Sequence, residues 1–128
     1  EPELNIRNFE FQILKFSGFL PELFVCVKCG QEIVAGEHRY SVSNGGVICL
    51  GCSDISNTMD MSLASIKLLR YFNRHSTAGE SQLRIKETTY TEVRNLLLET
   101  IIFWLEKDLK SSQFIDHLKT IQTPLTKL

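Results

Sequence analysis

The sequence has 128 residues, of which 43% are aliphatic, aromatic or cysteine and 23% are charged, so it predicts one ordinary globular domain and excludes a disordered segment. Its formal charge is −1, whereas a domain that binds nucleic acid chiefly through phosphate contacts carries a clear positive excess. No apolar run approaches the roughly 20 residues that span a membrane, and nothing at the N-terminus resembles a secretion signal. A cytoplasmic protein is expected, because the cysteines fit reduced thiols that hold zinc. Because the chain opens Glu1-Pro2 without a methionine, we expect it to be part of a longer protein.

Residues 3–17 predict the first helix, which Gly18 is well placed to end. One face of this helix collects apolar side chains at helical spacing, namely Ile6, Phe9, Ile13 and Phe16. We expect this face to pack in the core, with the turn around Pro21 leading the chain back toward it.

Four cysteines in two C-x-x-C pairs follow, and they are the only cysteines of the chain: Cys26, Cys29, Cys49 and Cys52. This spacing is typical of a four-thiolate zinc site, which leaves no open coordination position and therefore has a structural role. Two disulfides would need a secreted protein, and one redox-active pair would leave the other pair unexplained. His38 could replace one thiolate, and a redox switch in which oxidation ejects the zinc also stays open.

The segment between the two cysteine pairs predicts a small β-hairpin. Residues 38–43 alternate, Asn44-Gly45-Gly46 is a turn signal, and Val47-Ile48 leads directly into Cys49. So short a hairpin is marginally stable in water, so we expect the metal to stabilise it. The predicted fold class is mostly α: a helical domain with an inserted small zinc-ribbon-like β-hairpin module.

Helices are predicted again after a polar connector at 53–61. One begins after the N-cap Ser62 and ends near Arg74, another spans 91–109, and a short one spans 112–119. The helix at 91–109 is apolar around most of its circumference, so we expect it to be buried on several sides. We predict a single domain over 1–128, divided into a first helix and turn (1–24), a zinc module (25–53) and a helical core (54–128), with the core of the helices separate from the zinc module.

No catalytic set of residues is evident in the sequence, so we do not expect an enzyme. The three histidines are isolated along the chain: His38, His75 and His117. Lys67, Arg70 and Arg74 form a basic stripe, which is either a solvated helix face or a contact for DNA phosphate or an acidic peptide. Arg94 projects from the apolar side of the long helix, either in a structural ion pair or at the rim of an apolar groove.

The order of these motifs resembles the zinc-binding, helical C-terminal part of the RecO family of bacterial recombination and repair mediators. The resemblance covers Phe9 to Lys119, nearly the whole chain. It is carried by five runs, of which the second and third are the most specific: Phe9 to Lys15, Gly18 to Leu23, Cys26 to Gly30, Gly45 to Cys52 and Leu109 to Ile115.

The resemblance implies a non-enzymatic, nucleoid-associated protein that acts with RecR, and in some bacteria RecF, to load RecA on single-stranded DNA and to anneal strands. The N-terminal OB-fold of that family is absent here, so weak binding of single-stranded DNA is expected. The family also implies docking of the acidic, hydrophobic tail of single-strand-binding protein on the helical part, for which Lys67, Arg70, Arg74 and Arg94 are candidates by their pattern. Some family members lack the cysteines, which favours a structural zinc. The alternative is a zinc-ribbon interaction module of a transcription complex, whose hairpin, with Arg39 and Tyr40, makes the contact.

Overall fold

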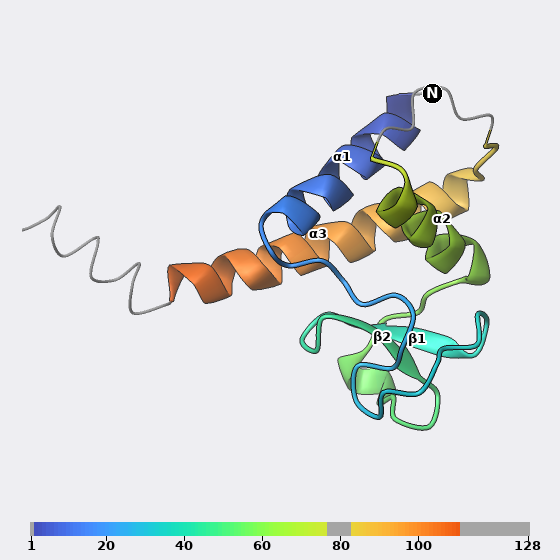
Figure 1. Ribbon diagram of the computed structural model, residues 1–128, viewed down its shortest axis with the longest axis vertical. Coiled ribbons are helices and arrows are strands. Elements are labelled where there is room, and N and C mark those ends of the chain that lie inside the picture. The colour runs from blue at the N-terminus through green and yellow to red at the C-terminus, as the bar shows by residue number, and fades with distance from the viewer. Residues whose placement is uncertain (1, 77–82, 111–128) are drawn as a thin grey trace, which may run out of the picture.

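A computed structural model describes residues 2–76 and 83–110 of the chain. As predicted, this part is mostly helical with one two-stranded antiparallel hairpin (Figure 1). In Figure 1, α1 lies along one side of the long helix α3, and the hairpin lies on the other side, next to α2. The elements in chain order are α1 (Pro2–Phe16), β1 (His38–Ser41), β2 (Gly46–Cys49), the 3₁₀ helix η1 (Ile55–Asn57), α2 (Leu63–Arg74) and α3 (Glu87–Leu109).

Helix α1 occupies the predicted residues within one position at each end, but the prediction of its buried face was wrong. The predicted face is exposed: Ile6 (47%), Phe9 (66%), Ile13 (41%) and Phe16 (83%). The buried face instead combines Leu4, Phe11 and Leu14 with polar side chains. Those polar groups find partners there, since Gln12 Nε2 donates to the carbonyl of Phe72 at 2.9 Å. Satisfied hydrogen bonds remove the cost that a polar group otherwise meets in a core.

The hairpin is confirmed, with His38 opposite Cys49 and Ser41 opposite Gly46. A third segment joins its edge, because Val47 N–H donates to the carbonyl of Glu22 and Glu22 N–H donates to that of Gly45, both at 2.9 Å. Gly46 makes this approach possible: a Cβ built on it would lie 2.4 Å from the Glu22 carbonyl oxygen. The chain that leads into the first cysteine pair is thereby fixed to the strand that leads into the second.

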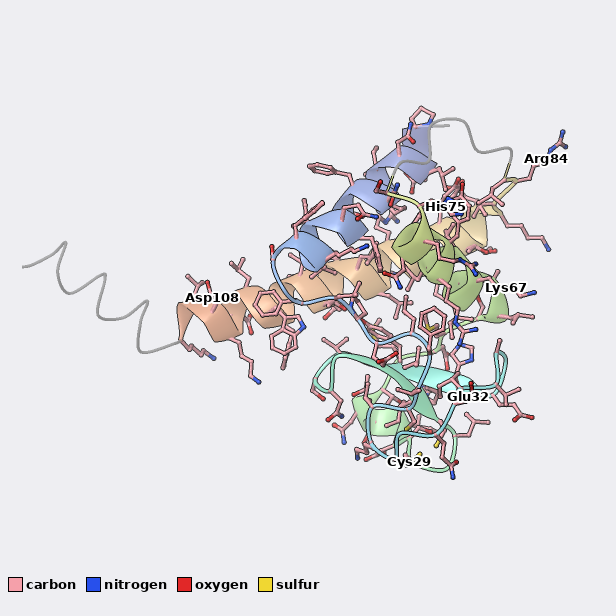
Figure 2. The ribbon with its side chains drawn as sticks, in the orientation of Figure 1. Cys29, Glu32, Lys67, His75, Arg84 and Asp108 are labelled. Carbon is pink, nitrogen blue, oxygen red and sulfur yellow. The ribbon has the colours of Figure 1, made fainter. Side chains whose placement is uncertain are left out.

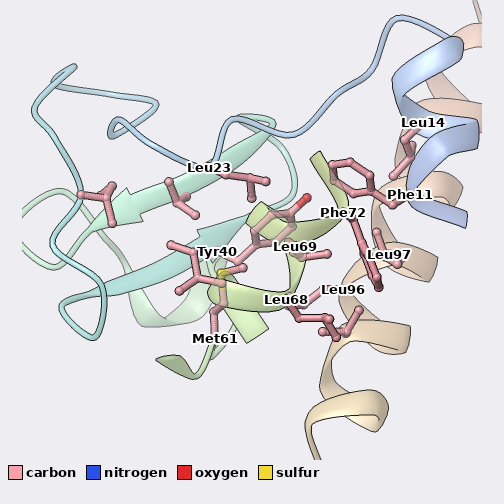
Figure 3. Close-up of a cluster of buried hydrophobic side chains, with 14 of the residues drawn as sticks. Phe11, Leu14, Leu23, Tyr40, Met61, Leu68, Leu69, Phe72, Leu96 and Leu97 are labelled. Carbon is pink, nitrogen blue, oxygen red and sulfur yellow. The ribbon is translucent and has the colours of Figure 1, made fainter. Parts of the chain in front are cut away.

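One continuous core links the hairpin to the helices (Figure 3), so the expectation of a separate helical core was wrong. Tyr40 on β1 is 1% exposed, and its hydroxyl lies 2.8 Å from Thr100 Oγ1 of α3. Burial raises the pKa of Tyr40 to about 12, against a smaller lowering by the Thr100 hydrogen bond. The buried side chains come from the three α-helices, from the hairpin and from the segment before the first cysteine pair, including Phe11, Leu23, Val47, Ile48, Ile66, Leu69, Phe72, Val93 and Leu97.

Helix α2 begins as predicted, because Ser62 Oγ accepts the backbone N–H of Ser65 at 3.1 Å and caps it. The sequence did not reveal that Glu92 of α3 also serves this helix start. Its Oε1 accepts from Ser62 N–H at 2.6 Å and from Ser65 Oγ at 2.5 Å, so it joins the two helices. Tyr40 and Met59 form an isolated bridge, so the predicted polar connector is partly ordered against the hairpin.

Helix α3 ends at the predicted Leu109 but begins four residues earlier than predicted, at Glu87. Thr89 and Tyr90 have modest helix propensity, yet they are buried, and tertiary packing outweighs propensity. The expectation that this helix is buried on several sides was wrong, because its buried residues lie on one face: Thr89, Tyr90, Val93, Leu96, Leu97 and Thr100. In the second half apolar side chains are exposed: Leu98 (47%), Ile102 (41%), Leu105 (54%) and Leu109 (43%).

The helix predicted at 112–119 lies outside the described residues. Within 2–76 and 83–110, no helix has both the length and the apolar character required to cross a bilayer.

Candidate metal centre and basic groove

The fold brings the two cysteine pairs together at the end of the hairpin away from α1, α2 and α3 (Figure 2, near the labelled Cys29). The Sγ atoms of Cys26, Cys29, Cys49 and Cys52 all lie within 4.8 Å of one another, and Cys29 Sγ is 3.9 Å from Cys49 Sγ. Cys26 is buried, Cys49 and Cys52 are half-buried and Cys29 is exposed. The four thiols therefore form one cluster just below the surface.

This donor set fits a tetrahedral metal ion. A Zn–S distance of about 2.3 Å places the sulfurs of a regular tetrahedron about 3.8 Å apart, close to the separation of Cys29 and Cys49. Four thiolates would fill every position of such a site, so no position remains for substrate or water. The arrangement can therefore hold a metal ion that cross-links two loops, and it offers no position for metal catalysis.

Backbone N–H groups point at the innermost sulfur and favour its ionised form. Lys28, Cys29 and Cys49 each donate to Cys26 Sγ, at 3.4, 3.5 and 3.4 Å. Burial raises the pKa of the Cys26 thiol, but these N–H groups lower it by more, to about 6. The side-chain hydrogen bond with Cys49 chiefly raises the pKa of Cys52, to about 12. The N–H groups around Cys26 thus favour the thiolate form in which a cysteine binds a metal ion.

The first cysteine pair has its own turn, which is followed directly by a glycine. Gly30 has φ of +77°, and its N–H donates to the carbonyl of Cys26 at 2.9 Å rather than to a sulfur. The turn is closed by Cys26 N–H, which donates to the Gln31 carbonyl at 2.7 Å. Val27 N–H donates to Val47 at 3.0 Å, so the turn is also attached to β2.

His38, considered as a replacement ligand, is not part of the thiol cluster. It is buried, and its Nδ1 accepts the N–H of Gly36 at 3.0 Å. Burial lowers the pKa of His38, and the nearby charge of Arg70 lowers it further. This side chain is thus held in its neutral form within the core, away from the metal position.

A groove beside α2 collects two of the four basic candidates. Lys67 and Arg74 both line a cavity of about 490 Å³ whose other lining residues are largely apolar: Ala64, Leu68, Tyr71, Leu83 and Ile85. Both cations are exposed, and they stand two helical turns apart, about 10 Å along the axis. Sequence reasoning missed Leu83 and Ile85, which precede α3 and meet α2 only through the tertiary fold.

The other two basic candidates have different neighbours. Arg70 Nε donates to the carbonyl of Leu23 at 2.9 Å, and its guanidinium lies 4.9 Å from the centre of the Phe24 ring. Arg94 is exposed rather than buried in an apolar face, and it acts electrostatically on Glu10 of α1. Burial raises the pKa of Glu10, while Arg7 and then Arg94 act in the opposite direction. Neither Arg70 nor Arg94 lines the groove.

Comparison with known proteins identifies a family. The family model described as "Recombination protein O C terminal" matches residues 1–113. A protein named DNA repair protein RecO from Dehalococcoides mccartyi (strain CBDB1) is 34% identical over 119 residues, which is 93% of this chain and 47% of the relative. Proteins of the same name from Roseiflexus sp. (strain RS-1) and Desulforamulus reducens are 32% and 33% identical over 91% of this chain, and 42% and 46% of their own lengths. The chain thus spans about half the length of these curated relatives. No solved structure matches.

Proposed function

The chain belongs to the RecO family, whose C-terminal part it matches, and on that premise we propose that it is a non-enzymatic mediator domain of DNA repair and recombination. In this role it contributes to loading RecA on single-stranded DNA and to strand annealing through contacts with an RecR-like protein, single-strand-binding protein and DNA. With a formal charge of −1, its own binding of single-stranded DNA is weak and involves few phosphates.

One structural Zn²⁺ bound by the four cysteines is part of this proposal. The geometric fit of the thiol cluster and the low pKa of Cys26 support it, because zinc binds thiolates. When bound, the ion cross-links the two loops that carry the cysteine pairs. Zinc content measured on the purified protein, with one equivalent expected per chain, tests this assignment.

The observation that carries the proposed partner contact is the groove beside α2, with Lys67 and Arg74 at an apolar cavity. We assign this groove to the acidic, hydrophobic tail of single-strand-binding protein. Its two cations suit carboxylates, and its apolar lining, with Tyr71, suits an aromatic end. Arg70 donates to the Leu23 carbonyl, and Arg94 does not line the groove. We therefore narrow the four candidate peptide-binding residues to Lys67 and Arg74.

Fluorescence anisotropy with a labelled acidic peptide that ends in phenylalanine tests this assignment. Exposed charge contacts contribute up to about 1 kcal/mol each, so the Lys67→Ala/Arg74→Ala double variant should weaken binding roughly ten-fold. The matched control is Lys110→Ala, which removes an exposed cation at the C-cap of α3. Equal affinity of the double variant and the control would contradict the groove assignment, while the zinc measurement would be unaffected.

The alternative, in which the hairpin itself contacts a transcription partner, gains no support from the geometry. Tyr40 is buried against Thr100. Arg39 is engaged within the chain, since its Nε donates to Thr58 Oγ1 at 2.6 Å and its Nη1 lies 2.5 Å from Asp60 Oδ1. Replacing either residue would first disturb the fold, so neither is available as a free contact residue.

A further inference from the structure

The C-terminal end of α2 is fixed against α1 by side-chain hydrogen bonds. The last carbonyl groups of a helix have no donor within the helix, so they need partners from elsewhere. Three side chains of α1 donate to carbonyls at this end: Gln12 to Phe72 at 2.9 Å, Lys15 to Asn73 at 3.4 Å and Asn8 to Ser76 at 3.2 Å. The residues at the end of α2 therefore have a defined position beside the groove.

His75 is the C-cap residue of α2 and stacks on an aromatic residue of that groove (Figure 2). Its backbone N–H donates to the Tyr71 carbonyl at 2.9 Å. Its imidazole ring lies 4.4 Å from the Tyr71 ring, centre to centre, with 29° between the two ring planes. Tyr71 lines the groove and is half-buried, whereas His75 is exposed. The imidazole thus supports the ring that an occupant of the groove would contact.

We propose that His75 is a further residue of the peptide-binding groove: it holds the Tyr71 ring and, when protonated, adds a positive charge to those of Lys67 and Arg74. This inference rests on the proposed function of the groove. An exposed histidine changes its charge between about pH 5 and 8, whereas the carboxylates of an acidic peptide stay ionised over that range. An imidazolium is also attracted to the face of an aromatic ring, and a positive charge suits the C-terminal end of a helix. The groove should therefore bind an acidic peptide more tightly as the pH falls.

Other charged groups surround His75, and their titration has to be separated from that of the histidine. Within the described residues, those of the neighbouring elements are Glu3, Arg7, Glu10 and Lys15 of α1, and Arg84, Lys86 and Glu87 at the start of α3. Burial raises the pKa of Glu10, although the charge of Arg7 opposes this, so Glu10 also titrates closer to neutral pH than an ordinary glutamate. All of these groups remain in a variant that changes only His75. The difference between that variant and the wild type therefore isolates the histidine.

Fluorescence anisotropy with the same acidic peptide, carrying a dye whose emission does not depend on pH, tests this inference at about pH 7.5 and 5.5 and equal ionic strength. The affinity of the wild type should rise roughly three-fold at the lower pH, as one exposed charge contact allows. His75→Phe keeps an aromatic ring on Tyr71 but cannot take up a proton. It should bind as the wild type does at the higher pH and show no gain at the lower pH.

His75→Ala removes both the ring and the charge. It should bind roughly three-fold more weakly than the wild type at the higher pH, because the Tyr71 ring loses its support, and it should also show no gain. The matched control is Ser76→Ala, which changes the adjacent exposed side chain but keeps the carbonyl that accepts from Asn8. This control should retain the affinity of the wild type and its dependence on pH.

The results separate a failure of this inference from a failure of the groove assignment. A gain at the lower pH that persists in His75→Phe would assign the gain to another group, such as Glu10, and overturn the inference. Equal affinity of the wild type and His75→Ala at both pH values would overturn it as well. In both cases a loss of affinity in Lys67→Ala/Arg74→Ala would leave the groove assignment intact. Equal affinity of that double variant and Lys110→Ala would instead reject the groove, and this inference with it.

Discussion

Gly46→Ala should loosen the junction that joins the two cysteine pairs. The added Cβ would lie 2.4 Å from the Glu22 carbonyl oxygen, 2.7 Å from its nitrogen and 2.8 Å from its Cβ, whereas real Cβ contacts essentially never fall below 3.0 Å. Because the first two of these atoms belong to backbone, no side-chain rotation relieves the clash. The segment around Glu22 must therefore move away from β2.

Two backbone hydrogen bonds stretch with that movement, those from Val47 N–H to Glu22 and from Glu22 N–H to Gly45. Each contributes about 1 kcal/mol net, and a buried partner left unpaired costs about 1–3 kcal/mol. We expect Gly46→Ala to lower the free energy of unfolding by about 2–4 kcal/mol, and Tm by about 6–15 °C for a chain of this size. Metal affinity should also fall, because Val27 of the first cysteine turn bonds to Val47 at 3.0 Å.

Thermal unfolding followed by circular dichroism, with zinc content measured on the same samples, checks this prediction. Gly51→Ala is the matched control: its Cβ would lie 4.0 Å from Cys49 Sγ, an ordinary contact, so we expect a change within about 0.5 kcal/mol. Gly30→Ala meets open space but has φ of +77°, so backbone strain alone should cost about 1 kcal/mol. If Gly46→Ala unfolded at the same temperature as Gly51→Ala, the close approach of Glu22 would not hold the junction.

Three further predictions concern the cluster, the core and the basic stripe. Cys49→Ser should abolish zinc binding and lower the free energy of unfolding by about 4 kcal/mol or more. The helical circular dichroism signal should be lost as well, because the core is continuous. A melting curve like that of the wild type would contradict a structural role for the zinc site. Tyr40→Phe should remove a loss of stability that the wild-type chain shows between about pH 10 and 12. The pKa of Tyr40 is raised in the folded state, so the contribution of this residue to the free energy of unfolding is fully present below pH 10 and is lost as the pH rises through the folded-state pKa. Denaturant titrations at several pH values check this expectation. Arg70→Ala should lower the free energy of unfolding in urea by about 1–3 kcal/mol, because the Leu23 carbonyl loses its hydrogen-bond donor. The affinity for the acidic peptide should stay within about two-fold of the wild type. A loss of peptide affinity without a loss of stability would show that Arg70 contacts the peptide.

The division of the basic stripe illustrates how neighbours decide the role of a charged side chain. Lys67, Arg70 and Arg74 share one sector of α2 by helical spacing, and that spacing alone treats them alike. In the structure a carbonyl from the chain ahead of the first cysteine pair accepts from Arg70, while Lys67 and Arg74 stay beside the groove. The sequence contains no signal for this separation, because the deciding carbonyl of Leu23 lies 47 positions away.

Sequence alone was sufficient for features whose cause is local. The spacing of the four cysteines predicts one thiolate cluster, Asn44-Gly45-Gly46 predicts the hairpin turn, and Ser62 predicts the start of α2. Each depends on a few neighbouring residues whose backbone geometry restricts what they can form. The family resemblance rests on the same local runs, and the comparisons confirm it.

Only the tertiary structure decided which faces are buried. Helix α1 carries two apolar stripes, and the one with Phe11 is buried, where Gln12 beside it donates to the carbonyl of Phe72, 60 positions away. Helix α3 is apolar along its length, but in the described part of the chain its second half buries only Thr100, against Tyr40 of the hairpin, and leaves Leu98, Ile102, Leu105 and Leu109 exposed. Burial depends on which surfaces meet and on whether their polar groups find partners there, and a one-dimensional pattern of hydrophobicity contains neither.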